Sequence, residues 1–346
     1  MELMYRRTEG SDVREGYLRN FEADFDITTD STSPTNDFEI KMAMPESAND
    51  LLYKENEVST IVYVDGTEFG GIITGYDIDL RRNSITYSGM TWRGLLSQYI
   101  IEPPSGQNYR VVSGDLLTIL SNLPMHRSFD IDSEMSYTSS RFQFDRYITT
   151  LEGITSLITD IDEDLRIFLR YDEATGNVNF SVAPVNDRTD LMEMSQDYGD
   201  RVRLSITYDG SIPKQLICLG AGELAEREVI HLYADDNWNI SQSGYGNTYP
   251  VQTYDYSGSK NLLKDGKKQF KKLISQHRRI QVFVEGIDLN LSDVIAAREL
   301  VTGEYATAEI TRVIWRCDDY GTYQTESFEY STKIKTYSIE DGGGKA

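Results

Sequence analysis

The sequence predicts a mainly β protein with a smaller α+β segment in its middle. Two observations carry this prediction. Tyrosine dominates the aromatic residues, with 23 Tyr against 12 Phe and 3 Trp, and tyrosine favours strands and half-buried surfaces. Short apolar runs also alternate with polar, turn-forming segments through much of the chain. At 346 residues and 39% hydrophobic composition, the chain is long enough for two or three domains with ordinary cores.

Residues 1–105 are predicted to form a small β domain. Its strand-like runs are residues 16–24, 37–44, 58–64, 68–79 and 84–90. The pair Asp65-Gly66 between two of these runs is a strong signal for a two-residue β-hairpin. About six short strands with polar turns indicate a sandwich or a barrel. A helix-like segment at residues 91–101 follows, and Pro103 ends it.

Residues 106–200 mix helix and strand patterns and are predicted to form an α+β domain. One helix is expected over residues 114–123, with Ser113 as its cap and leucines on one face. A second helix is expected over residues 150–159, where apolar residues recur at helical spacing. A hairpin then completes the domain. Its two strands are residues 164–171 and 177–182.

Residues 201–335 return to strand patterns, interrupted by an inserted loop and helix at residues 235–277. The strand-like runs are residues 202–208, 215–219, 229–233, 280–284, 305–317 and 323–330. The helix is expected over residues 257–276, with an apolar side and a basic side that we interpret as a solvated face. Its bases are Lys260, Lys264, Lys267, Lys268, Lys271 and Lys272. Residues 336–346 include three consecutive glycines and are predicted to be a flexible tail.

The net charge of −22 is spread unevenly along the chain. Residues 1–105 and residues 106–200 each carry −10, whereas the remainder carries −2. An acidic chain does not bind nucleic acid by neutralising phosphates, so we expect no sequence-specific nucleic-acid binding. Two interpretations remain open. The acids form either a solvated surface that aids solubility or a surface past which DNA moves without adhering.

The glycine-rich segment after residues 215–219 has two possible interpretations. Residues 220–225 fit the pattern G-x-G-x-x-A, which cradles phosphates when a strand precedes it and a helix follows. The apolar run at residues 229–233 favours a second strand instead of a helix. We therefore interpret Gly220-Ala221-Gly222 as a tight turn between strands, and we expect no cofactor-binding residues.

Metal-binding and catalytic patterns are weak. The three histidines, His126, His231 and His277, are far apart and form no ligand motif. The acidic run at residues 160–164 begins like a calcium loop, but Leu165 stands where that loop has glycine. The sequence has no nucleophile elbow and no phosphate-binding loop. We therefore expect no catalytic residues, no metal site and no enzymatic activity.

Cysteine usage and hydropathy indicate where the protein is made. Cys218 and Cys317 are predicted to be buried free thiols, because both lie in apolar runs and no disulfide framework is present. No stretch approaches 18 apolar residues, and the N-terminus lacks an apolar signal core. We expect synthesis in a cytoplasm, without an export signal or a membrane anchor.

Four stretches of the sequence resemble the hub proteins of phage tails and of phage-derived injection particles. The family is the siphovirus-type hub, related in fold to the central hub of contractile tails. The stretches are GYDIDLRRNSITYSGMTWRGLLSQYIIEPP (75–104), LICLGAGELAEREVIHLYAD (216–235), YDYSGSKNLLKDGKKQFKKL (254–273) and DLNLSDVIAARELVTGEYATAEITRVIWRC (288–317). The chain departs from the family at Leu291-Ser292-Asp293-Val294, where a G-D-x-V turn is expected.

This resemblance implies the architecture. Residues 1–105 and 201–335 would be two tail-tube-like β-barrel domains that flank the α+β domain. Three subunits would form a ring with pseudo-sixfold symmetry.

The resemblance also implies the function. The homotrimer would cap the tail tube, convert sixfold tube to threefold tip and seat spike or fibre proteins around a channel that opens for ejection. The implied partners are a tail tube or distal tail protein, a tape-measure protein and other baseplate proteins, and DNA could pass through the lumen. The implied location is the tail tip of a virion or of a bacteriocin-like particle.

Two other functions remain as alternatives. One is a tail-associated cell-wall hydrolase, although little sequence follows the last strand to hold a lytic domain. The other is a β-rich adhesin that binds a receptor or carbohydrate, with Trp238, Tyr245, Tyr249 and Tyr254 as an aromatic platform. We interpret that aromatic segment as an interface loop that becomes ordered on assembly.

Overall fold

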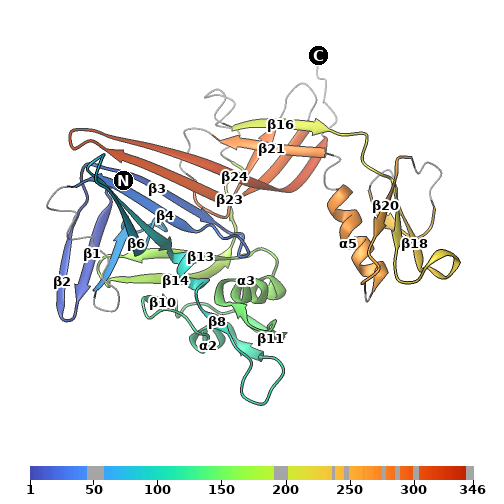
Figure 1. The fold of residues 1–346 in the computed structure, drawn as a ribbon, viewed down its shortest axis with the longest axis horizontal. Helices are drawn as coiled ribbons and strands as arrows, with labels where there is room; N and C mark the ends of the chain where they lie inside the picture. Colours follow the sequence, from blue (N-terminus) through green and yellow to red (C-terminus); the bar gives the residue numbers. More distant parts are fainter. Residues whose placement is uncertain are drawn as a thin grey trace. The chain divides into compact units, whose positions relative to one another are not determined.

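The fold is mainly β, with four α-helices in the part of the chain that the structure describes (Figure 1). The computed structural model describes residues 1–44, 58–190, 202–235, 238–244, 249–259, 261–274, 278–284, 289–298 and 304–339. The chain divides into two compact units. The first comprises Met1–Val202 and Phe283–Ala346, and the second comprises Arg203–Val282. No helix among the described residues is long and apolar enough to cross a membrane.

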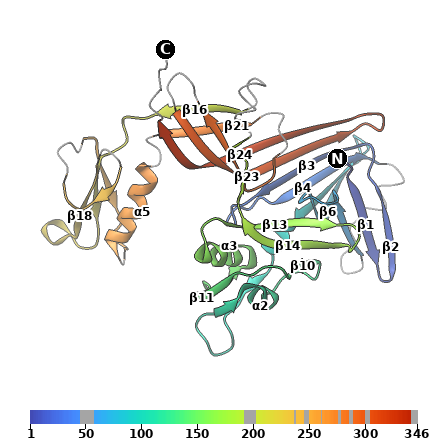
Figure 2. The same cartoon turned by 180° about the vertical axis from the view of Figure 1, so that it is seen from behind.

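An eleven-stranded sheet forms the framework of the first unit. Its strand order is β15-β22-β23-β3-β4-β7-β6-β5-β1-β2, and β24 pairs with the other edge of β23. The strands are β1 (Met4–Glu9), β2 (Asp12–Tyr17), β3 (Phe21–Thr28), β4 (Asp37–Ala43), β5 (Val58–Tyr63), β6 (Gly70–Asp79), β7 (Ser84–Thr91), β15 (Asn186–Asp187), β22 (Asp293–Arg298), β23 (Glu304–Asp319) and β24 (Gln324–Ile339). Figures 1 and 2 show β23 beside β3, at opposite ends of the sequence.

The described strands form no closed barrel, because the path of the sheet ends at β15 and at β2. The reason lies in β3, which pairs with β4 on one side and with β23 on the other. The N-terminal strands therefore continue into the C-terminal strands instead of closing on themselves. The division into three domains stays a prediction, with boundaries at residues 1–105, 106–200 and 201–335.

Alternation of apolar and polar residues places one face of the sheet in the core. In β3, Phe21, Ala23, Phe25 and Ile27 are buried, and the residues between them are charged or more exposed. The ring of Phe25 stacks on Phe38 of β4 at 4.9 Å between centroids and lies 5.3 Å from Trp315 of β23. This aromatic cluster joins the N-terminal and C-terminal strands through a shared core.

Gly89→Ala in β7 is expected to lower the free energy of unfolding by about 1–3 kcal/mol, measured by urea denaturation. A Cβ atom at this position would lie 2.1 Å from Cζ of Phe38 and 2.5 Å from the carbonyl oxygen of Ile72. Gly75→Ala is the control, since its Cβ would meet only Oγ of Ser88, at 3.3 Å. Equal costs for the two substitutions would contradict the close packing at Gly89.

The hairpin signals of the sequence are confirmed, with one difference in loop length. β5 and β6 pair antiparallel around Gly66, whose φ is +70°. The connection is longer than the predicted two residues. The amide of Val64 donates to the carbonyl of Phe69, so residues 65–68 form the loop. β24 continues to Ile339, so residues 336–339 are strand and not the predicted flexible tail, and the remaining tail residues lie outside the described part.

The α+β segment packs beneath the sheet and shares part of its core. Its elements are α1 (Trp92–Leu96), β8 (Ile100–Ile101), β9 (Val111–Asp115), α2 (Leu116–Ser121), β10 (Phe129–Ile131), β11 (Thr138–Gln143), β12 (Ile148–Thr149), α3 (Thr150–Ile161), β13 (Leu165–Asp172) and β14 (Asn177–Pro184). A capping box between Thr149 and Glu152 begins α3. Asp115, and not the predicted Ser113, caps α2. Tyr171 of β13 lies 4.1 Å from Tyr63 between ring centroids, which joins this segment to β5.

The second unit is a small sheet covered by one helix. Its strands are β17 (Gln215–Leu219), β18 (Val229–Ala234), β19 (Ile240–Ser241) and β20 (Val251–Asp255), in the order β19-β18-β17-β20. The helix predicted over residues 257–276 is present as α5 (Leu262–Ile274), which begins later than expected and packs its apolar residues over β17 and β18. A Cβ at Gly266 of α5 would lie 2.5 Å from Sγ of Cys218, so the helix approaches the sheet closely there. The pair β16 (Val202–Tyr208) and β21 (Arg278–Val284) forms a separate two-stranded sheet.

Candidate functional site

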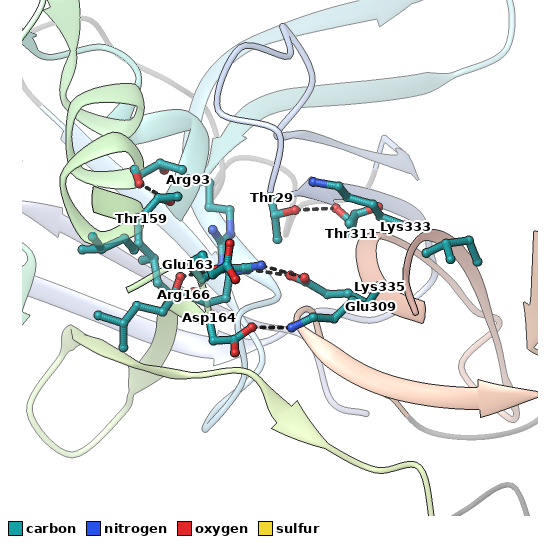
Figure 3. Close-up of a pocket in the computed structure, with 15 residues that line it drawn as sticks. Thr29, Arg93, Thr159, Glu163, Asp164, Arg166, Glu309, Thr311, Lys333 and Lys335 are labelled. Carbon is teal, nitrogen blue, oxygen red and sulfur yellow. Dashed lines mark hydrogen bonds and ion pairs between the residues drawn. The ribbon is translucent and has the colours of Figure 1, made fainter. Parts of the chain in front are cut away.

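A polar groove of about 480 Å³ lies in the first unit between α3, β13 and the hairpin β23–β24 (Figure 3). Two ion pairs cross it. The guanidinium of Arg166 binds both carboxylate oxygens of Glu309, at 2.6 and 2.7 Å, and Nζ of Lys335 binds Asp164. Arg166 and Asp164 belong to the α+β segment, whereas their partners belong to the hairpin. The groove is therefore a charged joint between two parts of the first unit.

The pKa values of the groove follow from these pairs. The hydrogen bonds to Glu309 raise the pKa of Arg166, and the hydrogen bond from Lys335 lowers the pKa of Asp164. A lowered carboxylate pKa means that the pair with Lys335 stabilises the fold at neutral pH. That stabilisation is lost as the pH falls through the folded-state pKa of Asp164. Its size is small because the Asp164 side chain is 53% exposed.

A third ion pair is buried, and its arginine, Arg93, is one of the residues that line the groove. Arg93 of α1 is 3% exposed, and its Nε donates to Oε1 of Glu68 at 2.5 Å. Its Nη2 also donates to the carbonyl of Ile167 in β13, at 2.7 Å. Burial raises the pKa of Glu68, and the charge of Arg93 opposes that rise. Arg93 therefore links the connection between β5 and β6 to α1 and β13 of the α+β segment.

The outer face of the sheet carries an acidic patch, which we define as Asp24, Asp26, Asp37 and Glu39. Two like-charge pairs lie directly opposite each other across β3 and β4, Asp24 with Glu39 and Asp26 with Asp37. Arg312 pairs with Asp26, and Arg316 pairs with Asp24. Asp37 and Glu39 have no ion-pair partner within the described residues. Burial, followed by the charge of Asp26, raises the pKa of Asp37.

Asp37→Asn is expected to raise the free energy of unfolding at pH 7 by about 0.5 kcal/mol, because it removes repulsion across the strand pair. A raised carboxylate pKa means that ionised Asp37 destabilises the folded state, so the gain shrinks as the pH falls through its titration. Urea denaturation at pH 7 and pH 4 measures both effects. The matched control is Asp77→Asn in β6, where the cross-strand neighbour is Thr86. An equal gain for Asp77→Asn would contradict this prediction.

The glycine-rich segment forms a corner between antiparallel strands. β17 pairs with β18, and the amide of Gly220 donates to the carbonyl of Glu228 at 2.8 Å. Gly222 has a φ of +93°, and a Cβ there would lie 2.6 Å from the carbonyl oxygen of Glu226. Only a three-residue 3-10 turn follows. The prediction that the segment joins two strands is confirmed, but residues 220–228 make the connection longer than a tight turn.

The proposed aromatic platform is not assembled in the described residues. Trp238 and Tyr254 both pack partly against the core of the second unit. The ammonium of Lys214 lies over the Trp238 ring, 5.4 Å from its centroid. Tyr249 is 81% exposed, and Tyr245 lies outside the described residues. These positions argue against a single flat surface for sugar stacking.

The histidines and cysteines take local roles. His126 accepts a hydrogen bond from the amide of Ser128 at 3.2 Å, and burial lowers its pKa. Nδ1 of His231 lies 2.9 Å from Nε2 of Gln215, whereas His277 lies outside the described residues. Cys218 and Cys317 are buried free thiols, as predicted, and burial raises the pKa of Cys317 to about 11.

The acidic run at residues 160–164 serves the end of a helix. Asp162 follows the last residue of α3 as its cap, and its carboxylate accepts from the amide of Asp164 at 2.9 Å. Asp164 itself pairs with Lys335. Across the described residues, no group of three or more His, Cys, Asp or Glu side chains is arranged to hold a metal ion.

The sequence patterns did not identify the groove or the acidic patch. The usable signal for the patch was the alternation in EADFD (22–26) and DFEIK (37–41), which places acids on the solvent side of both strands. The fold is that of a β-rich protein. Its main polar features are ion pairs that connect parts of the first unit and an acidic patch on the surface of the sheet.

Three solved structures are similar to this chain over nearly its whole length. A tail protein of prophage MuSo2 from Shewanella oneidensis is 13% identical, with a TM-score of 0.52 over 97% of this chain and 98% of that chain. A tail protein from Neisseria meningitidis MC58 is 16% identical, with a TM-score of 0.48 over 96% and 97%. A prophage tail protein from Listeria monocytogenes is 13% identical, with a TM-score of 0.47 over 97% and 96%.

The likeness to the Shewanella protein shows the fold. This chain has the fold of a phage tail protein, which confirms at the level of the fold the resemblance seen in the sequence. No protein-family model matches the sequence, and no curated protein matches it either.

Proposed function

We propose that this protein is a structural hub subunit of a phage tail or phage-tail-like particle. It caps the tail tube, converts sixfold tube to threefold tip and seats the spike or fibre proteins. The observation that carries the proposal is the fold likeness to the Shewanella tail protein, which spans 97% of this chain and 98% of that one. The quoted hub-like stretches, which extend from residue 75 to residue 317, support the same reading.

The proposed assembly is a ring of three copies around a channel. Heterologous contacts that close on themselves generate such rings. The described sheet supports this, because β2, β15 and β24 each pair on one side only and leave strand edges for a neighbouring chain. In this proposal the two tube-like barrels, assigned to residues 1–105 and 201–335, are features of the assembled ring.

The proposed partners follow from the position in the particle. They are the tail tube or distal tail protein, the tape-measure protein and the spike, fibre or other baseplate proteins. The acidity of residues 1–200 supports a channel through which DNA moves without adhering. We propose no enzymatic role, since four charged side chains of the groove neutralise one another in two ion pairs, Arg166 with Glu309 and Lys335 with Asp164.

A reconstruction of the particle from the producing strain tests the proposal. The expected result is density for this chain in three copies at the distal end of the tube. Any other copy number, or a position along the tube, would contradict it. Clearing of purified cell wall by the isolated protein would favour the hydrolase alternative, with a heat-denatured sample as the control. Glycan binding that is lost in Trp238→Ala would favour the adhesin alternative.

A further inference from the structure

The exposed face of α5 is a surface of lysines, which we call the lysine face. Its members are Lys264, Lys267, Lys268, Lys271 and Lys272, all exposed. The opposite side of the helix is buried through Leu262, Phe270 and Ile274, so the orientation of the lysine face is fixed by the core. Within the described residues, the first four of these lysines have no ion-pair partner.

Neighbouring lysines within the lysine face repel one another. Residues four apart on a helix are neighbours, and like charges at that spacing repel. Three such pairs occur in α5, between 264 and 268, 267 and 271, and 268 and 272. Each costs about 0.2–0.5 kcal/mol. An opposite charge placed against this face would convert the repulsion into attraction.

The acidic patch of the first unit carries the charge opposite to that of the lysine face. Its two cross-strand pairs also repel, and Asp37 and Glu39 are both exposed. Beside Glu39, the sheet surface is hollowed by about 390 Å³. Five acids and two bases line this hollow: Glu22, Asp24, Glu39, Asp318, Glu326, Lys41 and Arg316. Within the hollow, Glu22 pairs with Lys41, Asp24 with Arg316 and Glu326 with the N-terminal ammonium. Glu39 and Asp318 have no ion-pair partner among the described residues, so Glu39 brings an unneutralised carboxylate of the patch to the hollow.

Charge is divided between the two units. The second unit, Arg203–Val282, holds 8 acidic and 11 basic side chains, for a net charge of +3. The rest of the chain holds 48 and 23, for a net charge of −25. We infer that the lysine face of one copy binds the acidic patch of a second copy, as a head-to-tail contact of the ring. This inference rests on the proposed function and names one contact within it.

The second copy is the occupant that the charges favour. Two different surfaces of one chain that fit each other make a heterologous contact, which closes into a ring when the rotation allows. Duplex DNA and anionic membranes are the other occupants that a basic face could take, and the variants below distinguish them from a second copy. A contact of this kind also predicts salt sensitivity, since exposed charges are screened at high ionic strength.

Charge reversal on both surfaces tests the inference in the full-length protein. One variant is Lys264→Glu/Lys271→Glu, and the other is Asp37→Lys/Glu39→Lys. Sedimentation velocity over a range of concentrations, at low and at high salt, measures self-association. We expect wild-type protein to self-associate more weakly at high salt, and each reversal to weaken association about tenfold or more at low salt. Combining both reversals is expected to restore association.

The controls separate charge from folding. Arg81→Glu/Arg82→Glu makes the same change in net charge at the exposed turn between β6 and β7 and is expected to behave as wild type. Lys264→Glu places an acid four residues before Lys268, so the α5 variant is expected to keep its stability in urea. Lys264→Ala/Lys271→Ala provides a second α5 variant that removes charge without reversing it.

Several results would overturn the inference. If neither reversal weakened self-association, the contact between copies would involve other surfaces. The same conclusion would follow if the combined variant failed to restore association. A wild-type monomer at every concentration would also overturn it, while the particle reconstruction still decides the proposed function. If the reversals changed the sedimentation coefficient of the monomer but not its association, the lysine face would bind the acidic patch of its own chain. Binding of duplex DNA or phosphatidylserine vesicles that is lost in Lys264→Glu/Lys271→Glu would assign the lysine face to a polyanion.

Discussion

Arg93→Met is expected to lower the free energy of unfolding by about 3–5 kcal/mol, one of the two largest effects predicted for this protein. The substitution leaves the carboxylate of Glu68, which is 15% exposed, without its counter-charge. It also removes the hydrogen bond to the carbonyl of Ile167, which links α1 to β13. Urea denaturation at pH 7 measures the loss.

The double variant Glu68→Gln/Arg93→Met separates burial of an unpaired charge from loss of packing. We expect it to be more stable than Arg93→Met, because no charge remains buried. In the single variant the pKa of Glu68 rises further, so its deficit should shrink as the pH falls and Glu68 takes up a proton. Arg82→Met is the matched control, since Arg82 is 78% exposed and a surface pair contributes little. A deficit independent of pH would contradict this account.

Trp315→Ala is expected to cost about 3–5 kcal/mol, by loss of a fully buried aromatic side chain and creation of a cavity. Trp315 is 0% exposed and lies 5.3 Å from Phe25 and 4.9 Å from Phe69 between ring centroids. Because it belongs to β23, its loss should destabilise the N-terminal strands as well as the C-terminal hairpin. Hydrogen exchange read out by mass spectrometry can follow both regions separately.

The control for this substitution is Trp238→Ala in the second unit, where the indole is only partly buried. We expect a smaller cost there and unchanged exchange protection in β3. If Trp315→Ala increased exchange in β23 and β24 but left β3 and β4 protected, the single sheet that joins both ends of the chain would be contradicted.

The sequence predicted well those elements whose signals are local. The helix α3 begins at Thr150, as predicted, because its capping box and its apolar spacing lie within one segment. The helix α5 and its lysine face were also predicted, since the pattern of lysine and apolar residues fixes which side faces the core. The corner at Gly220-Ala221-Gly222 followed from the strand patterns on both sides.

The candidate site depended on contacts that no local pattern contains. Arg166 and Glu309 are separated by 143 residues, and their pairing requires β13 to lie against the hairpin β23–β24. Opposition of Asp24 to Glu39 depends on the register between β3 and β4. A shift of one residue in that register would place different side chains opposite each other and exchange the two faces of the strand.

The sequence by itself therefore determined the mainly β class, the two longer helices and most strands, because propensity, capping and periodicity act over a few residues. It was wrong over residues 97–101, where a helix was expected, because α1 ends at Leu96 and Ile100–Ile101 form β8. It also determined the uneven charge, which needs no structure. Only the tertiary structure decided that β23 pairs with β3 to make one open sheet from both ends of the chain. Strand pairing joins backbone groups regardless of their separation in sequence, so burial of a shared core, here around Phe25 and Trp315, selects the partner.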